Sequence, residues 1–332
     1  MKMKTQLAVS RMNIGIKVAD SAIRNKLAWT TVFVTERCNS RCRTCEIWKK
    51  KEPIDMPVAI FRDIVSDTTN KVYINVTGGE PLLHPEIGEI LQCLSDQKRP
   101  YTLFSNGILA DKLIGTCREF NVKNLIISCD GPKETYKRVR GMDNYDNIVR
   151  IVNELKDEVN IAIDYTVNPL NTREDLVKVK DFCDMHAIYL GVGPYDTPDF
   201  FDTIMAKQKL YDVGGLAAYP VDKFIRLYND WIDGNIRLPC YSIRFSCAIL
   251  PDGSVLMCQA KKIVLGNLNE LSLSEIWDSN RTKEIQRKYK NCNGCWMLCQ
   301  RSYDVGLAII MRHFVPKRIL NTAFGNYDWA KI

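Results

Sequence analysis

The chain has 332 residues, of which 46% are hydrophobic and 26% charged, a balance typical of a soluble globular protein. This length fits one large domain with a smaller appendage, and the composition excludes long disordered tracts. No apolar run approaches the ~18–20 residues that a membrane-spanning helix needs. The N-terminus shows no secretory signal, so we expect a cytoplasmic protein.

The net charge of +7 lies at the two ends of the chain. Residues 1–28 carry a net +5 and residues 303–332 a net +2, so the body between them is neutral. Both ends alternate basic with apolar residues, which suits peripheral contact with an anionic membrane surface. The same pattern also describes amphipathic segments that pack on the protein itself. The basic residues lack interleaved aromatic side chains, so we expect no nucleic-acid partner.

Short β-rich runs alternate with amphipathic helical stretches between residues 29 and 193. The expected strands are residues 29–35, 72–77, 101–105, 124–129, 160–167 and 188–192. The expected helices between them include residues 86–97, 111–120, 145–158 and 172–186. Strict alternation predicts parallel βαβ units, and therefore a parallel sheet or an open barrel. In such folds the chemistry gathers at the carboxyl ends of the strands.

The alternation ends near residue 194, and we place the end of the first domain, residues 29–200, shortly after it. Residues 201–239 are expected to form a helical connection, with an amphipathic helix over residues 222–233. A small α+β module over residues 240–302 and a tail over residues 303–332 complete the chain.

Turn and capping signals organise the small module. The sequence Pro251-Asp-Gly-Ser254 predicts the turn of a β-hairpin. Ser272 with Glu275 has the pattern of a capping box, which predicts a helix running towards Lys288.

Nine of the thirteen cysteines fall into three groups along the chain. In a reducing compartment, clustered cysteines more often bind metal than form disulfides. The remaining four, Cys93, Cys117, Cys129 and Cys183, are expected to be buried as small apolar residues. The groups are Cys38, Cys42 and Cys45; Cys240, Cys247 and Cys258; and Cys292, Cys295 and Cys299.

The first group follows the first expected strand with the spacing Cx3Cx2C. A loop at a strand end can wrap three thiolates around a metal centre, whereas a helix or strand cannot point all three at one place. Three thiolates are one fewer than a [4Fe–4S] cluster normally takes, which leaves one iron open. A structural zinc ion would need a fourth ligand, and none is evident near the loop or among the three histidines.

This loop resembles the signature of the radical S-adenosylmethionine (radical SAM) superfamily. The sequence Gly78-Gly79-Glu80, after the second expected strand, is similar to the GGE motif of that family. The resemblance implies a partial (β/α)6 TIM-like barrel whose [4Fe–4S] cluster is held by Cys38, Cys42 and Cys45. It also implies that the two glycines and Glu80 hold the amino group of SAM, since glycine permits close approach and a carboxylate suits an ammonium.

Further SAM contacts are implied at the later strand ends. Ser105 and Asn106 resemble the turn on the ribose side, and Ser128 with Asp130 resembles the position that bonds the ribose. Arg140 resembles the arginine that faces the SAM carboxylate, and Val192 could line the adenine. Each of these residues taken alone could equally be a turn or capping residue.

The later cysteines resemble the SPASM/twitch extensions of the superfamily, which carry auxiliary iron–sulfur clusters. The full SPASM pattern needs Cx2Cx5Cx3C and a further cysteine, whereas this chain has Cx2Cx3C and no cysteine after Cys299. The resemblance therefore implies the shorter twitch form with one auxiliary [4Fe–4S] cluster. We expect its ligands to be Cys240, Cys258, Cys292 and Cys295, with Cys247 and Cys299 as replacements. A zinc ribbon is the alternative.

The resemblance implies reductive cleavage of SAM to a 5′-deoxyadenosyl radical that abstracts hydrogen from a substrate, with an electron donor of the flavodoxin or ferredoxin type. The substrate is left open. We favour a lipid, a lipid-linked molecule, or a sugar or cyclitol alcohol. A peptide is the alternative, and we expect no peptide-recognition domain before Cys38. A non-catalytic zinc or iron–sulfur scaffold is a second alternative, although a scaffold needs neither an open iron nor a Gly-Gly-Glu turn.

Overall fold

A computed structural model describes residues 25–196, 207–216, 221–324 and 327. The basic N-terminal segment proposed over residues 1–28 therefore lies almost wholly outside the described residues. Most of the expected strands, helices and cysteine groups fall inside them.

The strands of the described residues form one nine-stranded sheet in the order β6-β5-β4-β3-β2-β1-β7-β8-β9. Strands β1 to β6 pair in parallel, which confirms the alternation predicted from the sequence. The strands are β1 (Trp29–Phe33), β2 (Tyr73–Thr77), β3 (Tyr101–Ser105), β4 (Asn124–Ser128), β5 (Asn160–Val167), β6 (Tyr189–Pro194), β7 (Ser246–Ile249), β8 (Ser254–Leu256) and β9 (Val264–Asn267).

Helices follow the strands of the barrel and continue after it. They are α2 (Val58–Asp67), α3 (Ile87–Asp96), α4 (Ala110–Glu119), α5 (Lys133–Arg140), α6 (Tyr145–Leu155), α7 (Arg173–Met185), α8 (Val221–Ile232), α9 (Leu273–Asp278), α10 (Asn280–Lys288), α11 (Leu298–Met311) and α12 (Lys317–Phe324). Short 3₁₀ turns lie at η1 (Ile47–Lys49), η2 (Pro81–Leu83) and η3 (Ser242–Arg244).

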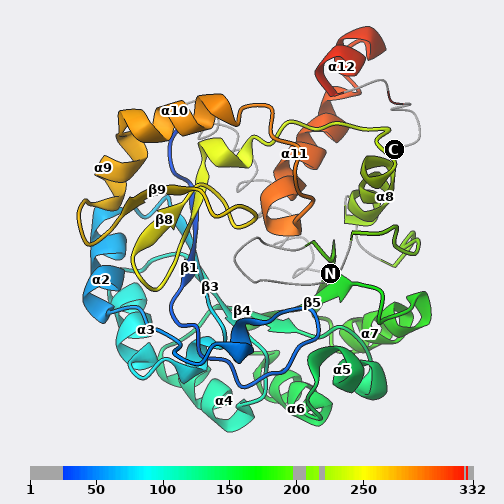
Figure 1. The fold of residues 1–332 in the computed structure, drawn as a ribbon. Helices are drawn as coiled ribbons and strands as arrows, with labels where there is room; N and C mark the ends of the chain where they lie inside the picture. The colour runs from blue at the N-terminus through cyan, green and yellow to red at the C-terminus, as the bar shows by residue number, and fades with distance from the viewer. Residues whose placement is uncertain (1–24, 197–206, 217–220, 325–326, 328–332) are drawn as a thin grey trace.

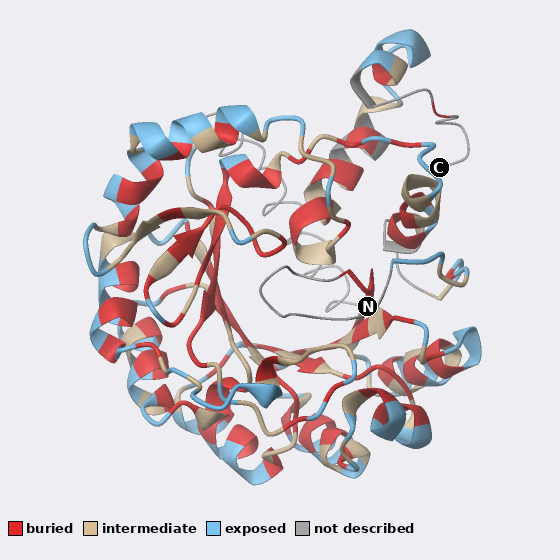
Figure 2. Ribbon diagram, viewed as in Figure 1, coloured by how far each residue is buried: buried red, intermediate tan, exposed pale blue. Residues whose placement is uncertain are grey.

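The sheet curves, with helices α2 to α7 along its outer side and α11 over its inner, concave side (Figure 1). Apolar residues of these helices and strands form the main hydrophobic core, which includes Phe61, Leu103, Ile127 and Ile163. Figure 2 shows the buried positions concentrated on the strands and on the inward faces of the helices. This is the α/β partial barrel that the sequence predicted, with a smaller C-terminal part.

Two features of the C-terminal part differ from the sequence prediction. The helix expected from Ser272 towards Lys288 is two helices, because Ser279 ends α9 and its side chain caps α10 by accepting a hydrogen bond from the Thr282 N–H. The predicted hairpin is present as β7 and β8, but β7 also pairs in parallel with β1. The small module is thus joined to the barrel sheet.

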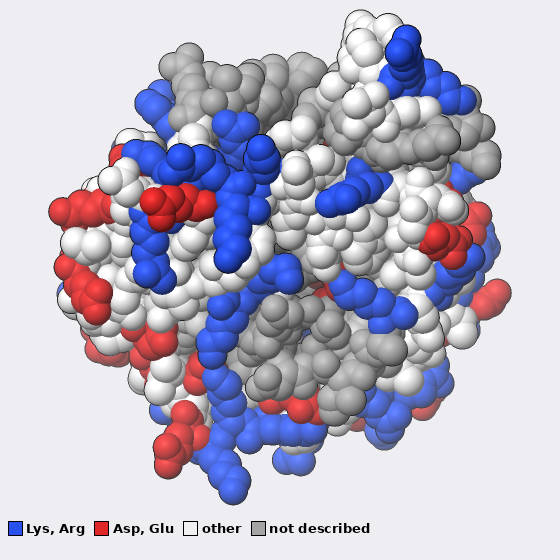
Figure 3. All heavy atoms as spheres, turned by 45° about the horizontal axis from the view of Figure 1, so that its top comes forward, with Lys and Arg blue, Asp and Glu red and all other residues white. Residues whose placement is uncertain are grey.

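Charged side chains are unevenly spread over the surface. Lys and Arg side chains gather over the part of the fold that carries α10, on the face shown in Figure 3. At the C-terminal end, Phe314 and Ile319 are 81% and 56% exposed. No helix among the described residues is long and apolar enough to cross a membrane.

Candidate functional site

The first cysteine group lies in the loop between β1 and η1, at the carboxyl end of the barrel strands. Cys42 is buried, whereas Cys38 and Cys45 are half-buried. The loop is tied to the end of α5, because Arg41 N–H donates to the Arg140 carbonyl at 3.2 Å and Arg43 N–H to the Val139 carbonyl at 2.9 Å. Cys38 and Cys45 each interact electrostatically with Cys42 and lie in the same loop. That the three hold a cluster stays a prediction.

The Gly78-Gly79 pair packs directly against this loop. Gly79 N–H donates to the Thr35 carbonyl and Glu80 N–H to the Arg37 carbonyl, each at 2.7 Å. A Cβ on Gly79 would lie 2.2 Å from the Arg37 oxygen, and one on Gly78 would lie 2.4 Å from the Thr35 oxygen. Only glycine fits at these two positions without moving the cysteine loop.

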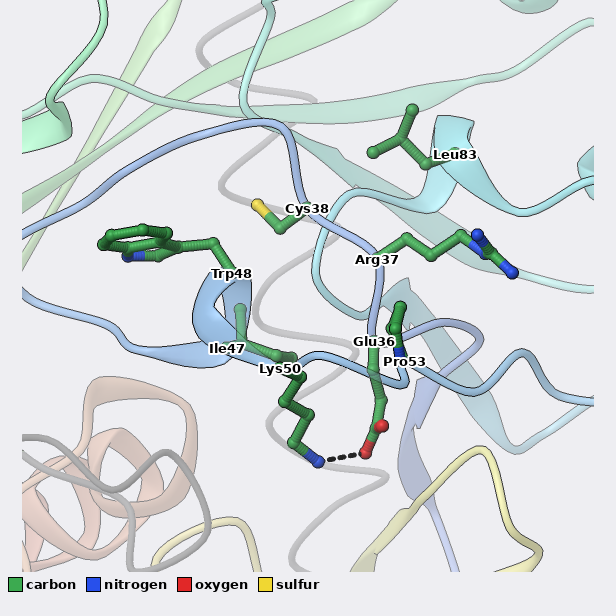
Figure 4. A pocket seen from close by; sticks show the side chains of 8 residues that line it. All are labelled: Glu36, Arg37, Cys38, Ile47, Trp48, Lys50, Pro53 and Leu83. Carbon is green, nitrogen blue, oxygen red and sulfur yellow. Dashed lines mark hydrogen bonds and ion pairs between the residues drawn. The ribbon is translucent and has the colours of Figure 1, made fainter.

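A pocket of about 340 Å³ opens beside Cys38. In Figure 4 the Cys38 sulfur and the Trp48 ring come from opposite sides of this pocket, with Arg37 and Leu83 farther along it. Trp48 is fixed by donating from Nε1 to the Cys42 carbonyl at 3.2 Å. Trp48 was not among the site residues predicted from the sequence, although an aromatic residue three positions after the last loop cysteine is a usable signal.

Glu80 is buried where β2, β3 and η2 meet. Its carboxylate accepts hydrogen bonds from Asn106 N–H at 2.7 Å, the Ser105 hydroxyl at 3.0 Å and Leu82 N–H at 3.3 Å. Burial raises its pKa to about 7, and these donors oppose that rise. The Asn106 side chain also donates to Asn39 Oδ1, at 2.8 Å. The structure therefore brings Glu80, Ser105 and Asn106 together beside the cysteine loop.

Arg140, at the end of α5, lies between the cysteine loop and Asp130. Its Nε is 2.6 Å from Asp130 Oδ2, and its Nη1 is 3.7 Å from the Cys42 sulfur. Asp130 Oδ1 accepts a hydrogen bond from Thr166 N–H at 2.8 Å, so both carboxylate oxygens have protein partners. Asp130 is 1% exposed. In this geometry Asp130 orients Arg140.

The two remaining predicted SAM contacts lie farther along the strand ends. Ser128 ends β4 and is half-buried. Val192 is fully buried in the main core, whereas its neighbours Gly191 and Gly193 belong to the other face of β6. A Cβ on Gly193 would lie 3.1 Å from the Leu298 Cβ at the start of α11.

The donor set of the first group suits an iron–sulfur cluster. Burial raises the pKa of Cys38 to about 11 and that of Cys45 to about 12, so these thiols favour thiolate only beside a stabilising cation. His84 is occupied, because its Nε2 contacts the Met56 carbonyl at 2.8 Å and its Nδ1 accepts from Glu86 N–H at 3.0 Å. Within the described ranges no three His, Cys, Asp or Glu side chains are placed to hold a single metal ion. Cluster thiolates bind different irons and do not share one ion.

A second cysteine group forms where the segment before β7 meets the segment before α11. Cys240 and Cys258 are buried, and Cys292 and Cys295 are half-buried. Cys240 N–H donates to the Cys292 carbonyl at 2.8 Å. The Cys240 thiol interacts electrostatically with those of Cys258 and Cys295, and Cys258 with that of Cys292. These four are the ligands favoured from the sequence.

A buried ion pair adjoins this second group. The Arg301 guanidinium is 0% exposed, with Nη1 2.9 Å from Asp304 Oδ2, and it is placed to donate to the Cys240 thiol. Its Nε has no hydrogen-bond partner among the described residues. A buried cation with spare donors next to four thiols suits thiolate ligands and the sulfides of a cluster. Sequence patterning gave no sign of Arg301 or Asp304.

The two alternative ligands differ in their surroundings. Cys247 is buried within β7, where its sulfur lies 3.5 Å from the Thr30 hydroxyl of β1, and no other cysteine perturbs it. Cys299 lies in the first turn of α11, with its sulfur 3.3 Å from Gln259 Oε1, and its thiol interacts with Asp164 and Cys258. Cys247 therefore packs in the sheet, and Cys299 faces the concave side of the barrel.

Comparison with known proteins assigns the two parts of the chain. The radical SAM superfamily profile matches residues 32–183, which contain the cysteine loop and the Gly-Gly-Glu turn. Residues 32–183 form a radical SAM domain. The profile of the SPASM iron–sulfur cluster-binding domain matches residues 240–296, which contain the second cysteine group. The radical SAM domain implies a [4Fe–4S] cluster and SAM, and the SPASM domain implies auxiliary iron–sulfur cofactors.

Individual relatives of this radical SAM protein are distant. A GTP 3′,8-cyclase of Aliarcobacter butzleri is 27% identical over 169 residues, which cover 48% of this chain and 52% of the cyclase. The mycofactocin maturase MftC of Mycolicibacterium smegmatis is 22% identical over 295 residues, 81% of this chain and 74% of the maturase. The chain spans about half the length of most of the curated relatives it matches.

Two solved structures share the fold. SuiB of Streptococcus suis, bound to its precursor peptide SuiA, has a TM-score of 0.66 at 15% identity, over 81% of this chain and 72% of SuiB. The enzyme anSMEcpe with bound AdoMet has a TM-score of 0.58 at 18% identity, over 89% of this chain and 98% of anSMEcpe.

The contact between Gly79 and the cysteine loop predicts a selective loss of iron. In Gly79→Ala, the new Cβ would lie 2.2 Å from the Arg37 oxygen and would displace Cys38. We expect about four irons per chain after anaerobic reconstitution, instead of about eight, with an unchanged circular dichroism spectrum. Gly115→Ala on α4 is the control, because nothing lies within 4 Å of its new Cβ. Full iron loading of the Gly79 variant would contradict this account.

The position of Cys247 within the sheet predicts that its side chain is not needed for iron binding. We expect Cys247→Ala to retain about eight irons per chain and Cys258→Ala to retain about four, because only the second removes one of the four expected ligands. Iron and sulfide analysis of the two variants, prepared side by side, measures the difference. Loss of iron from Cys247→Ala with retention in Cys258→Ala would reverse the ligand assignment.

Proposed function

We propose that this protein is an enzyme that cleaves SAM reductively and removes a hydrogen atom from a small polar substrate. The observation that carries the proposal is the three-thiol loop held against Gly78-Gly79, with Arg140 at 3.7 Å from the Cys42 sulfur. When bound, the cluster and SAM supply one-electron cleavage to a 5′-deoxyadenosyl radical, which takes the hydrogen atom. The residues of the protein bind the cluster and SAM, orient the substrate and shield the site from solvent.

In this proposal each residue near the loop has a separate task. Cys38, Cys42 and Cys45 hold the cluster and leave one iron open. The backbone of Gly78 and Gly79, together with Glu80, receives the SAM amino group, since a carboxylate that already accepts three donors is fixed in place.

The residues at the later strand ends hold the rest of SAM. Arg140 pairs with the SAM carboxylate and is oriented by Asp130 at 2.6 Å. Ser105, Asn106 and Ser128 lie on the ribose side. The backbone around Val192 lines the adenine.

The second group has a supporting role. Cys240, Cys258, Cys292 and Cys295 would hold one auxiliary [4Fe–4S] cluster, the cofactor expected of the twitch form. Arg301 would donate to the ligand Cys240 and place a positive charge beside the cluster. The cluster would exchange an electron with the substrate or brace it.

A sugar or cyclitol alcohol is the substrate we favour, either free or linked to a lipid. Exposed Phe314 and Ile319, 81% and 56% exposed next to Lys317 and Arg318, would suit contact with an anionic membrane surface. A peptide is the second candidate, because the mycofactocin maturase matches across 81% of this chain. The test is to measure 5′-deoxyadenosine formation with soluble cyclitols, with anionic vesicles and with peptides. The compound class that stimulates its formation identifies the substrate class.

The reductant we propose is an acidic flavodoxin- or ferredoxin-type protein. Lys and Arg side chains gather over α10, which carries Arg281, Lys283, Arg287 and Lys288 (Figure 3). Charge complementarity with this face would steer an acidic donor towards the protein.

The proposal predicts the behaviour of the loop variant in which Cys38, Cys42 and Cys45 are all replaced by alanine. We expect iron to fall from about eight to about four per chain and dithionite-driven 5′-deoxyadenosine formation to be lost, because one of two clusters is removed. Chromatographic analysis after anaerobic reconstitution measures both. Zinc in place of iron, or iron without SAM cleavage in the unaltered protein, would favour a scaffold.

A further inference from the structure

Asp164 is a carboxylate on β5 that the proposed chemistry does not use. Its register partners are Ser128 on β4 and Gly191 on β6, so all three lie on one face of the sheet. A Cβ on Gly191 would lie 3.6 Å from Asp164 Oδ1. Since Gly193 on the same face of β6 meets Leu298, this face is the concave one covered by α11.

Asp164 is half-buried, and its carboxylate has no partner within the described part of the protein. Among the described residues its carboxylate makes no hydrogen bond and no ion pair, although its backbone carbonyl accepts from Cys129 N–H at 3.0 Å. Burial, reinforced by the charge of Asp130, raises its pKa to about 6. Arg140 opposes this rise, but its Nε is already paired with Asp130 at 2.6 Å.

A half-buried carboxylate on the concave face, without a donor among the described residues, is available to pair with an opposite charge on a ligand. The side chain next to it on β6 is absent because position 191 is glycine, which leaves room beside the carboxylate. Asp164 also interacts with the Cys299 thiol of α11 and pairs in register with Ser128, at the ribose side of the proposed SAM site. It therefore lies on the concave face between the end of β4 and the start of α11.

We propose that Asp164 is a substrate-binding residue that pairs with a protonated amine of the substrate, one strand away from Ser128. This inference rests on the proposed function, since it names the chemistry of the molecule that would lie beside SAM. It narrows the favoured substrate to an amine-bearing polar molecule such as an amino sugar or an aminocyclitol. Gly191 sets the space available for that amine.

Thermal unfolding of the reconstituted protein tests whether the Asp164 carboxylate lacks a partner within the protein. We expect Asp164→Asn to leave Tm unchanged or higher, because the half-buried carboxylate has no hydrogen bond or ion pair with the described residues to lose. The matched control is Asp175→Asn, whose carboxylate accepts from Thr135 Oγ1 and Thr172 N–H, each at 2.9 Å, and which we expect to lower Tm. A fall in Tm for Asp164→Asn would show that Asp164 is a structural residue and would overturn the proposal.

A matched pair of probes tests the amine at pH 7. In the presence of SAM we expect glucosamine, but not glucose at the same concentration, to raise the Tm of the unaltered protein. Asp164→Asn should abolish this difference and Asp164→Glu should retain it. Equal shifts with the two sugars in the unaltered protein would overturn the assignment of an amine. Absence of 5′-deoxyadenosine formation by the unaltered protein would instead count against the proposed function, whatever the Tm values show.

Discussion

The close backbone contact between the first cysteine loop and the Gly78-Gly79 turn is the constraint on which the site depends. The loop leaves β1 and the turn leaves β2, so parallel pairing of two neighbouring strands brings them to the same edge. Hydrogen bonds of 2.7 Å then lock them together without room for a side chain. A thiol-bearing loop and a carboxylate-bearing turn become one rigid unit, which is what binding of a cluster and SAM requires.

The same arrangement extends through the rest of the barrel edge. Arg140 couples the loop to β4 through Asp130, and Asp130 in turn holds the backbone of β5 at Thr166. The C-terminal part is coupled as well, because β7 pairs with β1 and the start of α11 packs against Gly193. Pairing of β7 with β1 therefore joins the part of the chain that carries the second cysteine group to the sheet that carries the first. Asp164 lies on the concave face of this sheet, in register with Ser128.

The periodicity of apolar residues and the spacing of the expected strands were sufficient to predict the barrel. Alternating β-rich and amphipathic runs predict parallel strands, and the structure confirms six of them, with boundaries that differ by at most two residues. The cysteine spacing and the Gly-Gly-Glu turn resemble the motifs of the radical SAM superfamily, whose profile matches residues 32–183.

Features that depend on tertiary contacts could not be predicted from the sequence. Ser279 can end one helix and cap the next, and local pattern alone reads that stretch as a single helix. Spacing cannot distinguish Cys247 from Cys258, because only the pairing of β7 with β1 reveals that Cys247 packs against Thr30. Arg301 and Asp164 were not predicted as site residues, because the role of a charged residue depends on neighbours that are distant in the sequence. A lone carboxylate within the apolar run of β5 was nevertheless a usable signal.

The central claim is that Cys38, Cys42 and Cys45 hold a cluster whose remaining iron is open to SAM. Pulsed electron–nuclear double resonance of the reduced protein, with SAM labelled with ¹⁵N at its amino group, tests this most directly. The account predicts a ¹⁵N hyperfine coupling to one cluster, retained in Cys258→Ala and absent when the three loop cysteines are replaced. A reconstituted protein whose clusters show no coupling to the labelled amino group would contradict it.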